Sequence, residues 1–199
     1  KSEDSRTLVE QQLMEIYFNA LNFKVLKSDL LCLTPLIPIN DSIIAARLNV
    51  DVGDKVSFFK FVRNLEKMQD FVESIESKGI EKWNSSEISF YEIIIVLPEL
   101  NSQLSQTESG LLKIMPPFDN KHGNEWISPW QSISYANLRS SYHDEILIAL
   151  DDYIQSQYSK DDKAMEDALI NYELALYDLS DDIYVPSVSM LKIETWYNN

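Results

Sequence analysis

The segment His143-Asp144-Glu145 places one of the two histidines of the chain beside two carboxylates, a combination that could bind a metal ion. On a helix, however, the ligands of one ion must lie three or four residues apart, because consecutive side chains point in different directions. His143 has Arg139 and Leu147 at these spacings, and the other histidine, His122, lies well upstream. We therefore predict no metal ligand and no bound cofactor, and we interpret His143 as an exposed helix residue.

Other catalytic motifs are missing as well. The sequence has no Gly-x-Ser-x-Gly elbow and no glycine-rich phosphate or dinucleotide loop, and it holds four glycines among 199 residues. The one cysteine, Cys32, stands among leucines, which is typical of a small buried side chain, and it excludes an internal disulfide. The acidic doublets lack the central glycine and closing glutamate of a calcium loop. These absences predict that the protein is not an enzyme.

The net charge of −15 is concentrated near the C-terminus. Thirteen acidic residues and three lysines lie from Asp144 to Glu194, which is −10 of the total. Such a charge repels nucleic acids and attracts basic proteins, and tyrosine and tryptophan are the residues that dominate binding surfaces. We therefore predict a basic protein partner and no nucleic-acid binding, with an acidic surface that only confers solubility as the alternative. The expected partner-binding residues are Asp151, Asp152, Asp161, Asp162, Trp126, Trp130 and Tyr158.

The elements that must position these residues are helices, because apolar residues recur every three or four positions along the chain. The strongest pattern opens at Ser128-Pro129-Trp130-Gln131, where a cap residue is followed by proline and by a glutamine that can complete a capping box. It continues over 135–157 and, after a polar turn at 159–162, resumes over 165–179, with Leu169 and Tyr135 among the residues expected to face inward. This pattern predicts a C-terminal helical hairpin.

The upstream chain predicts further helices, in the order that follows. They are a helix over about 6–23 with Leu13, Ile16 and Tyr17 inward, a brief one capped by Asp41, a helix of about 24 residues between Gly53 and a left-handed cap at Lys78-Gly79, one that starts with a box at 84–87, and one over 100–114. Since Ile93-Ile94-Ile95-Val96 is β-branched, a short strand near 93–97 is the alternative there. A loop over 183–188 and a short apolar element over 190–197 complete the chain.

No repeat or linker divides the sequence, so we predict that residues 1–199 form a single helical domain, an irregular all-α bundle of six to eight helices.

The expected function is that of a non-enzymatic adaptor, a complex subunit, or an inhibitor or immunity-type protein. The alternatives are a secreted or envelope-anchored ligand-binding protein and a metal-dependent enzyme with a site made of scattered residues. We expect no membrane span and a cytoplasmic location. Because the sequence starts at Lys1 and not at methionine, a mature secreted or lipid-anchored protein is the alternative location.

Overall fold

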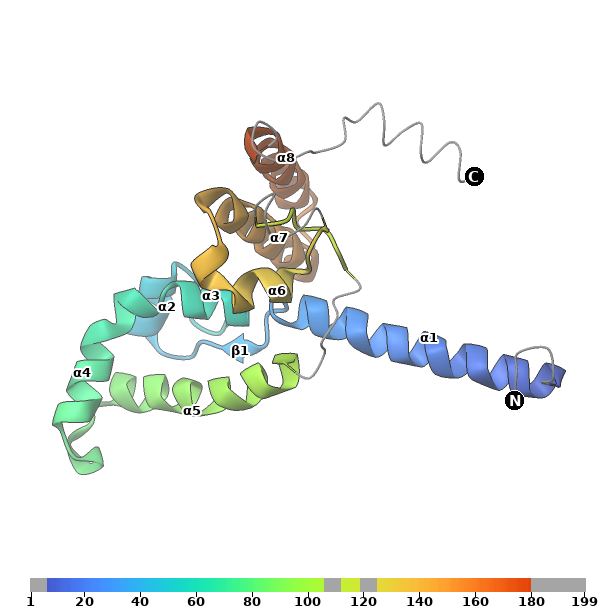
Figure 1. Cartoon of the computed structure of the whole chain (residues 1–199). Coiled ribbons are helices and arrows are strands. Elements are labelled where there is room, and N and C mark those ends of the chain that lie inside the picture. The colour runs from blue at the N-terminus through green and yellow to red at the C-terminus, as the bar shows by residue number, and fades with distance from the viewer. Residues whose placement is uncertain (1–6, 106–111, 119–124, 180–199) are drawn as a thin grey trace. The chain divides into compact units, whose positions relative to one another are not determined.

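The computed structural model describes residues 7–105, 112–118 and 125–179, and most of them lie in helices (Figure 1). The predicted all-α fold is therefore confirmed. By their contacts the residues group into two compact units, Lys1–Leu112 with Ser128–Gln131, and Lys113–Ile127 with Ser132–Asn199. That residues 1–199 behave as one domain stays a prediction. The elements expected over 183–188 and 190–197 lie outside the described residues.

The first unit consists of helices and one small sheet. Its elements are α1 (Leu8–Leu31), β1 (Ile37–Pro38), α2 (Ser42–Leu48), β2 (Lys55–Val56), α3 (Phe58–Arg63), the 3-10 turns η2 (Leu65–Met68) and η3 (Ile80–Lys82), α4 (Gln69–Ser77) and α5 (Ser85–Ser105). The two strands pair antiparallel, with Ile37 opposite Val56. As predicted, Asp41 caps α2, because its carboxylate accepts hydrogen bonds from the amides of Ile43 and Ile44 at 2.9 and 3.0 Å.

The prediction of one long helix after Gly53 is wrong, since the structure has α3, η2 and α4 in its place. The break lies at Asn64, whose side-chain amide donates to the carbonyl of Lys60 at 2.7 Å and so competes with the helical hydrogen bonds of the backbone. The prediction of a left-handed cap at Lys78-Gly79 is wrong too, because the backbone of Lys78 is extended and the φ of Gly79 is negative, at −68°. Residues 93–97 are helical within α5, so the small sheet of the fold lies elsewhere.

The core of the first unit collects side chains from both strands and from α2 to α5. Its buried members are Ile37, Ile39, Ile44, Ala45, Leu48, Val56, Phe61, Met68, Phe71 and Phe90. The ring of Phe90 stacks on both Phe61 and Phe71, with centroids 6.4 and 5.3 Å apart. Outside the core, the guanidinium of Arg47 covers the Phe71 ring at 4.3 Å and pairs with Asp70. These contacts hold α2, α3 and α4 against α5.

The start of α5 is fixed by a buried carboxylate. The box expected at 84–87 is present, because Glu87 accepts from the amide of Asn84 at 2.7 Å while the Asn84 side chain accepts from the amide of Glu87 at 2.9 Å. Lys78 donates to the same carboxylate at 2.7 Å, and Ser74 donates to it as well. The hydrogen bond from Lys78, then those from Ser74 and Asn84, lower the pKa of Glu87 to about 2.

Lowering the pH should therefore destabilise the folded protein, because Glu87 becomes protonated. Because the pKa of this group is lower in the folded than in the unfolded chain, its stabilisation is complete above the ordinary value of 4.5 and is lost as the pH falls toward about 2. In Glu87→Gln, the urea midpoint should be lower than in the wild type at neutral pH and should approach it as the pH falls through this window. The matched control is Glu76→Gln on α4, where the glutamate is exposed. Parallel acid profiles for the wild type and Glu87→Gln would contradict the assignment.

The second unit is built around two paired helices. From residue 128 onward the elements are α6 (Pro129–Ser134), whose residues up to Gln131 belong to the first unit, η4 (Ala136–Leu138), α7 (Ser141–Ser159) and α8 (Asp162–Leu179). Met115 forms an isolated bridge with Ile127. The predicted hairpin is confirmed: α7 and α8 pack along each other and are joined through Lys160, which has a φ of 58°. Tyr172 of α8 donates its hydroxyl to the carbonyl of Ile114 at 2.8 Å, and burial raises its pKa to about 12.

The capping box at Ser128 is confirmed as well. The amide of Ser128 donates to the Gln131 side chain at 2.8 Å, and the Gln131 amide donates to the Ser128 hydroxyl at 3.2 Å. However, the helix that it opens is short, because α6 ends at Ser134 and α7 begins at Ser141. The prediction of one continuous helix from Ser128 up to residue 157 is therefore wrong. Tyr135, expected to face inward, is 54% exposed at this interruption.

Candidate functional site

A groove of about 260 Å³ runs between α7 and α8. Each helix contributes residues at positions i, i+3, i+4 and i+7, which is the spacing of one helix face. From α7 these residues are Glu145, Ile148, Ala149 and Asp152, and from α8 they are Asn171, Leu174, Ala175 and Asp178. Both helices thus present the same arrangement to the groove, with two apolar side chains between two polar ones.

The groove is apolar in its middle and acidic at both ends. Ala149 and Ala175 are buried, and their small side chains leave a depression between the helices. Because helices joined by a short turn run antiparallel, Glu145 and Asp178 lie at the end away from the turn and Asp152 lies nearer to it. All three carboxylates are on exposed residues. An apolar side chain flanked by two cations would match this surface.

Helix α8 extends the surface beyond the groove. Leu169, Ile170 and Tyr177 are 51, 48 and 72% exposed, so the expectation that Leu169 faces inward is wrong. The exposed acids Glu166, Asp167 and Glu173 alternate with these apolar side chains along the helix. Exposed apolar residues among charges are typical of binding surfaces.

Several residues predicted to bind the partner lie on the surface of this hairpin. Asp152 lines the groove, and Asp162 and Tyr158 are exposed, the tyrosine at 63%. Asp161 is also exposed, but its carboxylate accepts a hydrogen bond from the amide of Ala164 at 3.0 Å and so caps α8. Their role in partner binding stays a prediction.

Other predicted residues offer less surface. Asp151 is 5% exposed, because it lies one helical turn after the buried Leu147 on the same face of α7. Trp130, in the first unit, is 8% exposed and packs edge-to-face on Phe58 with centroids 6.0 Å apart. Trp126 is half-buried. We therefore leave Asp151 and Trp130 out of the binding surface.

Glu145, Asp178 and the two alanines were not among the predicted binding residues. The signal was present, since an acid at the first or last position of an i, i+3, i+4, i+7 set, with alanine at i+4, occurs on both helices. The sequence pattern does not determine which face of α7 packs against which face of α8. A groove is defined only by that pairing.

His143 is fully buried, so its interpretation as an exposed residue is wrong. It occupies the third position of α7, where its Nδ1 atom lies 2.7 Å from the hydroxyl and 3.3 Å from the amide nitrogen of Ser140. The Nε2 atom lies 3.2 Å from the carbonyl of Pro117. Burial lowers the pKa of this imidazole, despite the hydrogen bonds to the backbone at Pro117 and Pro116 that raise it. In the part of the chain that the structure describes, which does not include His122, no three metal-binding side chains gather.

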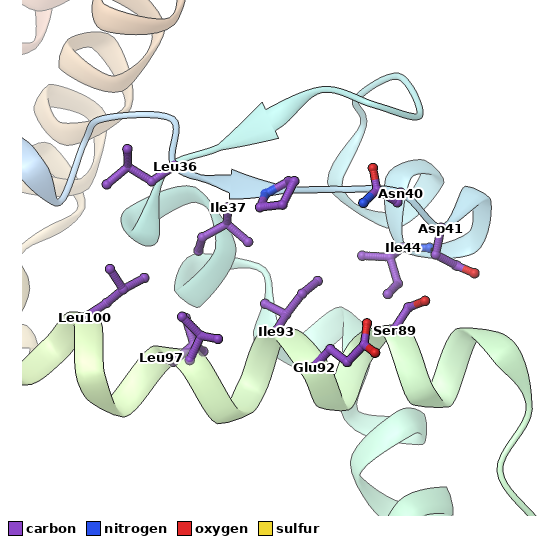
Figure 2. A pocket seen from close by; sticks show the side chains of 12 residues that line it. Leu36, Ile37, Asn40, Asp41, Ile44, Ser89, Glu92, Ile93, Leu97 and Leu100 are labelled. Carbon is purple, nitrogen blue, oxygen red and sulfur yellow. The ribbon is translucent and has the colours of Figure 1, made fainter.

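A second hollow, of about 250 Å³, lies in the first unit between β1, the start of α2 and α5 (Figure 2). Most of its wall is apolar, and a few polar side chains stand at one end. Pockets with this composition are the usual sites of small ligands.

Comparisons of the chain with family models, with curated proteins and with solved structures find no match. Among the helices of the described ranges, none combines the length and the hydrophobicity needed to cross a membrane. The function must therefore be inferred from the geometry of the two sites.

Proposed function

We propose that the protein is a non-enzymatic binding protein whose α7–α8 groove holds a basic segment of a protein partner. The observation that carries this proposal is the arrangement of the groove, an apolar middle to which both helices contribute, between ends that carry Glu145 and Asp178 on one side and Asp152 on the other. Oppositely charged ends fix the register and speed the encounter, while the apolar middle contributes affinity.

The dimensions of the groove suggest the form of the partner. Positions i and i+7 of a helix lie about 10 Å apart along its axis, so the partner should present two cations at a similar separation. A partner helix with lysine or arginine at i and i+7 and leucine at i+3 or i+4 meets this requirement. An adaptor, a complex subunit or an inhibitor of a basic protein could all use such a surface.

The proposal includes a protein partner in preference to a nucleic acid, because the carboxylates of the groove would repel phosphates. It also includes a cytoplasmic location, which cell fractionation with an antibody against the chain would test. Recovery of the protein in the envelope fraction would instead favour the anchored alternative.

The groove should bind a synthetic helical peptide that carries lysines at i and i+7 around a central leucine. Neutralising the three groove acids together, in Glu145→Gln, Asp152→Asn and Asp178→Asn, should weaken this binding by about tenfold at low salt, since each exposed ion pair contributes up to about 1 kcal/mol. Fluorescence anisotropy of the labelled peptide at low and high salt would measure the change. The same peptide with glutamates in place of lysines should not bind.

A matched control separates the groove from the general negative charge. The triple variant Glu66→Gln, Glu76→Gln and Glu81→Gln removes the same charge from exposed positions of the first unit, outside the hairpin. It should change the affinity much less than the groove variant. Equal weakening by both variants would show that only the overall charge matters and would contradict the proposed site. A natural partner would be a basic protein captured by the wild type and lost by the groove variant.

A further inference from the structure

The hollow in the first unit has one wall on α5 and the other on β1 and the start of α2 (Figure 2). The α5 wall is a single stripe of the helix, formed by Ser89, Glu92, Ile93, Val96, Leu97 and Leu100. The facing wall is formed by Leu36, Ile37, Pro38, Asn40, Asp41 and Ile44. Since all of these residues belong to one compact unit, the pocket is a property of that unit alone.

The polarity of the pocket changes along its length. In Figure 2 the oxygen-bearing side chains of Asn40, Asp41, Ser89 and Glu92 lie toward one end, and the leucines of the two walls lie toward the other. No lysine or arginine is among the lining residues. The pocket is therefore negatively charged at one end and apolar at the other.

The two carboxylates of the polar end differ in how they are held. Asp41 is fixed, because one oxygen accepts from the amides of Ile43 and Ile44 and the other accepts from the hydroxyl of Ser86 at 2.7 Å. Burial raises the pKa of Asp41, but these hydrogen bonds outweigh it and the pKa is lowered, so the group is ionised at neutral pH. Glu92 is exposed and, among the described residues, has no hydrogen-bond or ion-pair partner. One fixed and one available negative charge thus stand at the same end.

We propose that this pocket binds a small amphipathic amine, with its ammonium group at Glu92 and Asp41 and its alkyl chain along Ile93, Leu97 and Leu100. A fatty acid would bring a third carboxylate to this end, and a neutral hydrocarbon would leave the available carboxylate without a partner. The stripe from Glu92 to Leu100 is about 12 Å long, which suits an alkyl chain of medium length. This site does not depend on the α7–α8 groove, with which it shares no residue.

The test is a titration of the whole isotope-labelled protein with octylammonium, octanol and octanoate, monitored by NMR. The two ions are kept below their micelle concentrations and octanol below its solubility limit. Octylammonium should shift the backbone amides of residues around the pocket, including Ile37 and Ile93, in a saturable manner. Octanol should bind about threefold to fivefold more weakly, because it lacks the ion pair, and octanoate more weakly still. Octanoate binding as tightly as octylammonium, or shifts confined to residues away from the pocket, would overturn the proposal.

Two variants and a control locate the interaction. Glu92→Gln should lower the affinity for octylammonium about threefold to fivefold and leave that for octanol unchanged. Val96→Lys, at a position that is 49% exposed and one helical turn after Glu92, brings a competing cation within reach of this carboxylate and should weaken octylammonium binding without disturbing the core. Glu76→Gln removes an exposed charge from the same unit, outside the pocket, and should have no effect. Loss of affinity in Glu76→Gln equal to that in Glu92→Gln would overturn the proposal.

Discussion

Replacing Phe90 by alanine should lower the free energy of unfolding by about 3–5 kcal/mol, because it removes a large side chain from a closed core. Phe90 is 1% exposed and lies on α5. Its ring stacks on Phe61 of α3 and on Phe71 of α4, so one substitution removes contacts with two other helices. Aromatic pairs add about 0.5–1.5 kcal/mol to the effect of burial, which places Phe90 toward the upper end of the range. Urea unfolding followed by far-UV circular dichroism would measure the loss.

The matched control is Ile95→Ala on the same helix, at a position that is 54% exposed. It should change the free energy of unfolding by only about 0.5 kcal/mol, since exposed positions away from caps and networks tolerate substitution. If Phe90→Ala and Ile95→Ala cost the same, α5 would not pack on α3 and α4 as described.

The sequence was most informative where a side chain caps a helix. The capping residues Asp41, Asn84 and Ser128 were all predicted, and each makes the expected hydrogen bonds. Caps are local interactions between residues two or three positions apart, so a short stretch of sequence contains everything that they need. The small sheet was missed for the opposite reason, because its two-residue strands pair across an intervening helix and carry no periodic pattern of their own.

Helix lengths were overestimated where the apolar spacing continued across a break. At Asn64 a side chain takes the carbonyl of Lys60, and at Ser140 a new cap starts a second helix. In both places apolar residues recur in helical register on either side, so periodicity alone predicts one long helix. Both breaks involve hydrogen bonds of individual side chains, which the spacing of apolar residues does not record.

Periodicity also identified apolar faces without showing what covers them. Leu13, Ile16 and Tyr17 of α1 were expected to be buried, and they are 60, 65 and 59% exposed. On α7, against which α8 packs, Leu147 is fully buried. A repeat of three and four residues fixes only which side chains share a face, and burial requires a second element packed against that face. For the same reason the acidity of the α7–α8 hairpin was predictable and its groove was not.

Replacing His143 by alanine should cost about 2–4 kcal/mol, because it leaves a cavity and removes hydrogen bonds at both ring nitrogens. The amide of Ser140 can donate only to an unprotonated Nδ1, so the ring is neutral with its hydrogen on Nε2, which then donates to the carbonyl of Pro117. His143→Gln is the informative comparison, since glutamine at this position can accept from the Ser140 amide as in an ordinary capping box. It should cost less than alanine does, because only the contact with Pro117 and the ring packing are lost. Equal losses in the two variants would show that Nδ1 does not cap α7.

The neutrality of His143 predicts how this difference changes with pH. Burial holds the pKa of the imidazole below its ordinary value of 6.5, while Asp144 and Arg139, which form an ion pair at 2.9 Å beside it, act on it in opposite directions. Below about pH 6.5 the unfolded chain therefore gains a proton at this position before the folded chain does, and the free energy of unfolding falls. His143→Gln has no such group, so its stability should approach that of the wild type as the pH falls from 7 toward 5. Because Glu87 titrates at lower pH, the effects of these two groups on stability can be told apart. His143→Gln should flatten the pH dependence of the free energy of unfolding near pH 6, and Glu87→Gln should flatten it below about 4.5. A wild-type profile that does not change between pH 7 and 5 would mean that His143 gains its proton in the folded protein as readily as in the unfolded chain, which its hydrogen bond from the Ser140 amide does not allow.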